Sequence, residues 1–200
     1  MKKKNMWTIK LSTSALVLIP AAVGINYIGK LFAGTLKLPL WLDSIGTILA
    51  SMLAGPIVGA ICGGINNVIY GLTLDPISFI YGLTSIGIGL VVGAMTYRGF
   101  VNNIGKAVIV GLVAACVAAV ISTPINIGFW GGTTGNVWGD GLYTYLTANH
   151  FPMWLASFLD EIVVDIPDKI ATVIISYLIF KGLPKKLIIQ FSNDDELEKL

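Results

Sequence analysis

Six long apolar stretches divide the chain, and short polar or glycine–proline segments separate them. An apolar helix of about 20 residues crosses the hydrocarbon core of a bilayer, and a shorter helix spans it where the bilayer thins. The pattern predicts an all-α integral membrane protein with six transmembrane helices in one bundle. The expected spans are residues 12–29, 40–54, 57–72, 77–97, 107–122 and 154–183.

The segments between the spans predict where the helices end. Gly55 with the following proline, and Asp75 with the proline after it, are turn signals, and Pro124 is expected to end the fifth span. Residues 125–152 mix glycines with tryptophan, tyrosine and His150. Aromatic side chains are favoured at membrane interfaces, so this segment predicts a long, partly structured interfacial loop.

The composition supports a membrane protein, because 55% of the 200 residues are hydrophobic and 12% are charged, whereas soluble domains carry about 25% charged residues. The basic residues lie at the ends of the apolar stretches, so they indicate topology and not nucleic-acid binding. The predicted cytoplasmic side holds Lys2, Lys3, Lys4, Lys10, Arg98, Lys106, Lys181, Lys185 and Lys186, and the other side holds Lys30 and Lys37. This asymmetry predicts that both termini are cytoplasmic in a multi-pass protein of the bacterial cell membrane.

We expect one transmembrane domain over residues 1–187 and a charged cytoplasmic tail over residues 188–200. The start of the chain resembles a signal peptide, but it shows neither a clear cleavage site nor a change to soluble composition afterwards. We therefore expect it to be retained as the first span.

The sixth stretch, residues 154–183, carries five charged residues in its first half: Asp160, Glu161, Asp165, Asp168 and Lys169. An ionisable group inside a membrane costs about 2.5–3.5 kcal/mol or more unless it pairs or faces a polar cavity, and such groups generally mark function. At helical spacing Glu161 and Asp165 share one face with Asp168 or Lys169. We expect that face to point into the bundle.

The predicted topology brings further polar and aromatic residues to the same outer half of the bundle. They predict an outward-facing small-molecule pocket, because such sites combine apolar walls with a few placed polar groups. The candidate substrate-binding residues are Asp43, Asn66, Asn67, Tyr70, Asn126, Trp130, Trp138, Asp160, Glu161 and Asp165.

Several of these residues also have interpretations that involve no ligand. These interpretations are an Asp165–Lys169 ion pair, a cap of a broken helix at Asp168 after Pro167, solvated charges at Asp160 and Glu161, interhelical hydrogen bonds from Asn66 and Asn67, and an aromatic belt of Trp130, Trp138 and Trp154.

Motifs of common enzymes are missing from the sequence. It contains no G-x-x-x-x-G-K-[ST] phosphate loop, no H-E-x-x-H zinc motif and no G-x-S-x-G nucleophile elbow. A single histidine does not build a zinc protease site. We therefore expect no catalytic residues, no metal, no cofactor and no enzymatic activity in this chain.

The chain resembles the substrate-binding S component of an energy-coupling factor (ECF) transporter. Residues 38–73 carry the most specific part of the resemblance, with D-x-I-G-T, then G-P-x-x-G, then a Gly- and Asn-rich span, and residues 163–187 carry the second part. The resemblance implies that the chain captures a vitamin or related micronutrient outside the cell. It further implies that the partners are a membrane-embedded T component and two cytoplasmic ATPases. ATP hydrolysis would then occur only in these partner subunits.

The nature of the ligand follows from the candidate site. Ionised carboxylates only accept hydrogen bonds, so we expect a ligand that donates hydrogen bonds or carries positive charge. A queuosine-type deazapurine is our first hypothesis, with cobalamin and thiamine-like compounds as alternatives. An anionic ligand such as folate or pantothenate is disfavoured, because Lys169 is the one clear cation within the predicted spans.

An alternative function is a stand-alone proton-coupled secondary transporter, or a membrane sensor of a small molecule. In a proton-driven carrier, Asp165 or Asp168 would take up and release the proton. The sequence lacks an inverted repeat of broken helices, which disfavours this alternative.

Overall fold

The computed structural model describes residues 13–191, and this part of the chain is helical, with no β-strand. The helices are α1 (Thr13–Thr35), α2 (Ile45–Ala54), α3 (Pro56–Thr73), the 3₁₀ helix η1 (Pro76–Phe79), α4 (Gly82–Tyr97), α5 (Ile104–Trp130), α6 (Val137–Ala148), α7 (Met153–Gly182) and α8 (Lys185–Phe191). The prediction of an all-α protein is confirmed for these residues.

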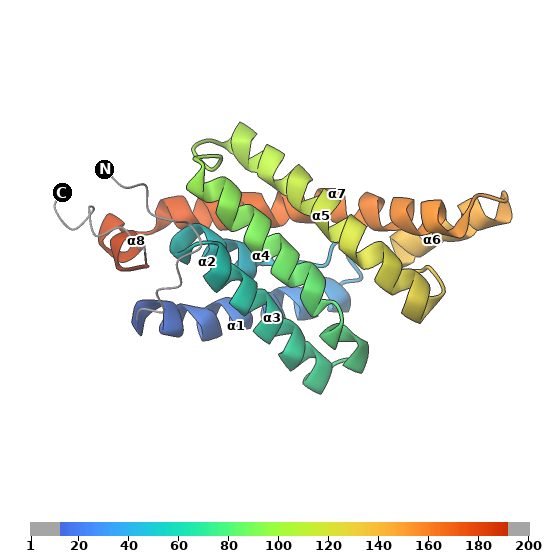
Figure 1. Ribbon diagram of the computed structural model, residues 1–200, viewed down its shortest axis with the longest axis horizontal. Coiled ribbons are helices and arrows are strands. Elements are labelled where there is room, and N and C mark those ends of the chain that lie inside the picture. Colours follow the sequence, from blue (N-terminus) through green and yellow to red (C-terminus); the bar gives the residue numbers. More distant parts are fainter. Residues whose placement is uncertain (1–12, 192–200) are drawn as a thin grey trace.

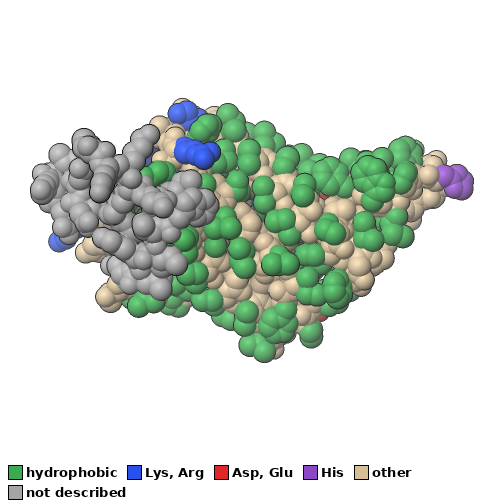
Figure 2. Space-filling view, viewed as in Figure 1, with side chains coloured by type: hydrophobic (Ala, Val, Ile, Leu, Met, Phe, Trp, Pro, Cys, Tyr) green, Lys and Arg blue, Asp and Glu red, His purple; other side chains and the backbone are tan. Residues whose placement is uncertain are grey.

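Four helical stretches are long and apolar enough to cross a membrane. They are Ala15–Thr35, Pro56–Thr73, Pro76–Tyr97 and Ile104–Trp130. Figure 2 shows hydrophobic side chains spread along the flank of the molecule, while the Lys and Arg side chains visible in this view lie toward the end that carries α8. These features are those of a multi-pass membrane protein.

The bundle is elongated along α7, which runs through most of its length (Figure 1). Helix α8 and the first turns of α1 lie at one end, and α6 packs against the start of α7 at the other. Helix α2 is short, but all ten of its residues are buried, and it contacts α1, α3, α4 and α7. It therefore forms the centre of the fold, although it is too short to cross a bilayer alone.

Glycines allow the central helices to approach closely. A Cβ added to Gly89 of α4 would lie 2.6 Å from the backbone nitrogen of Ala60 in α3, and one added to Gly46 of α2 would lie 1.9 Å from the carbonyl oxygen of Ala22 in α1. Small residues at such contacts are common in membrane proteins, where helices associate through close packing.

The predicted second span, residues 40–54, is wrong in its first part, because α2 begins only at Ile45. The preceding segment is not helical, and Leu42 adopts a left-handed conformation with φ of 51°. The backbone N–H groups of Trp41 and Leu42 donate to the carboxylate of Asp168. A partner distant in sequence therefore satisfies the donors that a helix would have used.

The prediction that the fifth span ends at Pro124 is also wrong. Helix α5 continues through this proline to Trp130, and α6 occupies much of the following segment. In this part of α5 the hydroxyl of Thr123 donates to the carbonyl oxygen of Ala119, 2.7 Å away. This bond does not replace the one that Pro124 lacks, because the carbonyl that loses its helical donor there is that of Val120.

Helix α7 is likewise continuous through Pro167, so the interpretation of Asp168 as the cap of a broken helix is wrong. The interpretation of Asp160 and Glu161 as solvated charges is wrong as well, since they are 0% and 6% exposed. Helix α8 crosses the predicted boundary between the domain and the tail at residue 187. Predictions for residues 1–12 and 192–200 lie outside the described residues.

Candidate functional site

A cavity of about 300 Å³ lies in the half of the bundle remote from α8. It is bounded by the end of α1, the segment before α2, the second half of α3, the start of α4, the end of α5 and the first half of α7. Its lining residues are Lys30, Trp41, Asp43, Asn67, Leu74, Asp75, Ser78, Tyr81, Thr84, Ser85, Ile88, Ala118, Ser122, Asn126, Trp130, Thr134, Gly135, Glu161, Asp165 and Lys169.

Six of the ten candidate residues meet around this cavity. They come from four separate parts of the chain, and they are Asp43, Asn67, Asn126, Trp130, Glu161 and Asp165. The convergence expected from topology is therefore present in the structure. Their role in binding stays a prediction.

The other four candidates, Asn66, Tyr70, Trp138 and Asp160, do not line the cavity. The hydroxyl of Tyr70 donates to the backbone carbonyl of Asn26, 2.8 Å away, and Asn66 is buried on the same helix with no hydrogen-bond partner among the described residues. Asp160 is completely buried and accepts a hydrogen bond from the hydroxyl of Thr134 at 3.0 Å. These contacts give Tyr70 and Asp160 structural roles next to the cavity.

Trp138 lies in a neighbouring groove instead of the cavity. Its indole Nε1–H donates to the backbone oxygen of Lys37 at 3.4 Å. This bond connects the start of α6 to the segment that follows α1.

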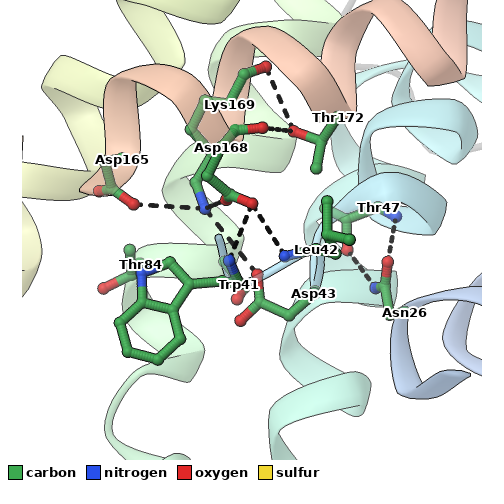
Figure 3. A network of polar contacts seen from close by, with 12 residues as sticks. Asn26, Trp41, Leu42, Asp43, Thr47, Thr84, Asp165, Asp168, Lys169 and Thr172 are labelled. Carbon is green, nitrogen blue, oxygen red and sulfur yellow. Dashed lines mark hydrogen bonds and ion pairs between the residues drawn. The ribbon is translucent and has the colours of Figure 1, made fainter. Parts of the chain in front are cut away.

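Lys169 is the centre of the charged network at one side of the cavity (Figure 3). Its ammonium nitrogen lies 2.5 Å from Asp168 Oδ2, 3.5 Å from Asp165 Oδ1 and 3.8 Å from Asp43 Oδ1. The predicted Asp165–Lys169 pair is therefore present, but the shortest contact of Lys169 is with Asp168. One buried cation serves three carboxylates.

Asp168 connects this network to the segment that precedes α2. While Oδ2 contacts Lys169, Oδ1 accepts hydrogen bonds from the backbone nitrogens of Trp41 at 3.0 Å and Leu42 at 2.8 Å (Figure 3). Asp168 is completely buried and does not line the cavity. Its contacts hold in place the segment that supplies Trp41 and Asp43 to the lining.

Asn26 of α1 holds the start of α2 in a similar way. Its Oδ1 accepts the backbone N–H of Gly46 at 2.6 Å, and its Nδ2 donates to the hydroxyl of Thr47 at 2.9 Å (Figure 3). The first N–H groups of a helix lack partners within that helix. Asn26 therefore fixes the helix that immediately follows Asp43.

A second polar chain lies at the other side of the cavity, between α4, α5 and α7. Asn126 Nδ2 donates to Glu161 Oε2 at 2.9 Å, and the hydroxyl of Tyr81 donates to Asn126 Oδ1. Asn126 is thus oriented by both neighbours, with its oxygen toward Tyr81 and its amide toward the carboxylate. Hydroxyl groups from Thr84 and Ser122, 3.0 Å apart, continue this polar wall.

The charges around the cavity do not balance. Its lining contains four carboxylates, Asp43, Asp75, Glu161 and Asp165, but only two ammonium groups, and Lys169 is already closest to a fifth carboxylate outside the lining. Asp165 is 2% exposed, and its Oδ2 has no hydrogen-bond partner among the described residues. The cavity therefore presents an excess of hydrogen-bond acceptors and negative charge.

Sequence reasoning missed several lining residues. Trp41 and Tyr81 stand at irregular segments before helices, where no helical spacing signals an inward face. The predicted first span ends at residue 29, but α1 continues to Thr35, and Lys30 within it lines the cavity. Thr84 and Ser85 of α4 lie within the predicted apolar span 77–97. Their adjacent hydroxyl groups are the sequence signal that could have marked them.

No group of three or more His, Cys, Asp or Glu side chains within residues 13–191 has an arrangement that could hold a metal ion. The ammonium group of Lys169 occupies the position between the carboxylates of α7 and Asp43 instead.

Comparison with known proteins adds no family assignment. No protein-family profile, curated protein or solved structure matches this chain.

Proposed function

We propose that this protein is the substrate-binding S component of an ECF-type transporter, with six membrane spans and both termini in the cytoplasm. In this proposal α7 is one further span, α2 together with the non-helical segment before it is the other, and the cavity lies in the outer half of the membrane. The protein would capture a micronutrient there and deliver it through a T component and two ATPases. The observation that carries the proposal is an acidic and aromatic cavity on which distant parts of the chain converge.

The lining supports a ligand that is cationic or rich in N–H donors. Glu161 and Asp165 offer acceptor oxygens, while Trp41 and Trp130 offer aromatic faces on which a planar or positively charged group can stack. A guanine-like edge presents adjacent N–H donors, and a thiazolium presents positive charge. A queuosine-type deazapurine remains the first candidate.

The size of the cavity supports a small ligand. A volume of about 300 Å³ lies at the lower end of the range of about 300–1,000 Å³ typical of small-molecule sites. It suits a bicyclic heterocycle or a thiamine-like compound. The corrin of cobalamin is much larger than this cavity, so cobalamin becomes the weakest of the three ligand hypotheses.

Asp165→Asn tests the proposal against a proton-coupled carrier. The wild-type protein and this variant are purified from the native host, retained small molecules are identified by mass spectrometry, and their affinities are measured by calorimetry. We expect the variant to bind the retained compound about 10- to 100-fold more weakly, because hydrogen bonds to charged groups contribute about 1.5–3 kcal/mol.

Asp160→Asn is the matched control, since Asp160 is a buried carboxylate of the same helix that does not line the cavity. Its affinity should stay within about threefold of wild type. A proton-coupled carrier would instead keep its affinity in Asp165→Asn and lose pH-dependent transport, and that result would reject the proposal.

A further inference from the structure

A second hollow of about 210 Å³ adjoins the cavity between the end of α1 and the start of α6. Lys30, Trp41 and Gly135 line both spaces. Trp41 therefore stands at the boundary between the cavity and the groove.

The groove is held together by bonds between its two sides. Trp138 Nε1 donates to the carbonyl oxygen of Lys37 at 3.4 Å, and Asn136 Nδ2 donates to that of Leu38 at 3.5 Å. Asn136 also begins α6, because its Oδ1 accepts the backbone N–H of Trp138. The groove is consequently a feature of the fold and not a gap between independent loops.

The charge of the groove is opposite to that of the cavity. Its charged lining residues are Lys30 and Lys37, and its lining contains no Asp or Glu. Neither ammonium group forms an ion pair with another residue in the described range, 13–191. Lys30 Nζ lies 4.2 Å from the ring centroid of Tyr70, a contact that orients the ammonium group without neutralising it.

We propose that the groove binds an anionic group, a phosphate or a carboxylate, of the same ligand whose donor-rich or cationic end enters the acidic cavity. This inference rests on the proposed function, and it narrows the substrate class to molecules with an anionic group at one end and N–H donors or a positive charge at the other. It also modifies the expectation that anionic ligands are disfavoured, since that expectation considered only charges within the predicted spans. Lys30 and Lys37 are the residues that select for the anionic group.

The test uses two pairs of probes that differ by one phosphate: thiamine with thiamine monophosphate, and guanosine with guanosine 5′-monophosphate. Their affinities are measured by tryptophan fluorescence on the full-length protein in a neutral detergent. We expect the phosphorylated member of at least one pair to bind wild type about tenfold more tightly or better. This preference should fall in Lys37→Met, which affects the groove alone, and disappear in Lys30→Met/Lys37→Met.

The matched control is Lys181→Met/Lys185→Met at the opposite end of the bundle. Lys181 likewise lies over a tyrosine ring, with its Nζ 5.3 Å from the centroid of Tyr177. This variant should keep the preference. Two results would overturn this inference and leave the proposed function untouched. One is equal affinity of wild type for both members of each pair, and the other is a phosphate preference that survives the loss of both groove lysines. Failure of all four probes to bind wild type would count against the proposed ligand class as well.

An anionic lipid headgroup offers the same phosphate chemistry near a membrane surface. The measurement is therefore repeated in phosphatidylcholine nanodiscs with and without phosphatidylglycerol. A preference that is unchanged by phosphatidylglycerol assigns the groove to the ligand. A preference that phosphatidylglycerol abolishes assigns the groove to lipid and overturns the inference.

Discussion

At the scale of single residues, Asp168 has the most consequential set of contacts in the charged network. Its two carboxylate oxygens bind different partners, the ammonium group of Lys169 and the backbone of the segment before α2. A buried ion pair contributes little over an apolar pair of the same shape, but removal of one partner leaves the other charge uncompensated. Asp168 therefore positions the ammonium group of Lys169 and the backbone of Trp41.

Asp168→Ala should lower the stability of the protein by about 3–5 kcal/mol, because it leaves Lys169 with only its two longer contacts. The measurement is thermal unfolding in detergent, where we expect a fall in Tm of roughly 6–20 °C. The double variant Asp168→Ala/Lys169→Met should recover part of this loss, since it removes both buried charges. A double variant less stable than the single variant would show that the charge of Lys169 is compensated by other groups.

The individual site residues were predictable where helical spacing or a buried charge marks them. Glu161 and Asp165 were identified because carboxylates inside an apolar stretch require an inward face. Asn66 and Tyr70 share an apolar span with Asn67, but only Asn67 lines the cavity. The sequence could not distinguish them, because the direction of each side chain depends on how α3 rotates against α1 and α4.

At the scale of elements, the fold depends on close contacts between α1, α2, α3 and α4. Gly89 lies where α4 meets the backbone of α3, and Gly46 lies where α2 meets α1. These contacts allow the short helix α2 to be buried on all sides. The segment that precedes α2 can then reach α7 and contribute Asp43 to the cavity.

Gly89→Ala should destabilise the protein by about 1–3 kcal/mol, because overpacking forces side chains and backbone to shift. The new Cβ would lie 2.6 Å from the backbone nitrogen of Ala60, and a backbone atom cannot move aside as a flexible side chain can. Thermal unfolding measures the effect. The control is Gly24→Ala in α1, where no atom lies within 4 Å of the added Cβ, and it should be neutral or slightly stabilising. Equal effects in the two variants would contradict the close packing of α3 and α4.

The positions of the helices were largely predictable from apolar length, but their ends were not. Turn signals located the boundaries between α2 and α3 and before η1, where glycine or Asp-Pro interrupts the chain. Pro124 and Pro167 misled the prediction, because both lie inside continuous helices. The start of α2 depends on Asp168, which is more than 120 residues away in sequence. A contact of that separation leaves no local signal.

At the scale of the whole molecule, polar and charged groups are unevenly distributed along the bundle. The cavity and the adjoining groove lie in the half remote from α8, and the flank presents hydrophobic side chains (Figures 1 and 2). This arrangement suits a protein that takes up a ligand from one side of a membrane. The proposed sidedness places the cavity outside and α8 in the cytoplasm.

The measurement that tests the central claim most directly is co-purification of the tagged, full-length protein from its native host under gentle extraction. Mass spectrometry then identifies both the associated proteins and the retained small molecules. We expect a membrane-embedded T component, two ATPases and a micronutrient that carries N–H donors or positive charge. A solitary protein without ATPases, under conditions that preserve a known ECF complex, would contradict the proposal and favour a secondary transporter.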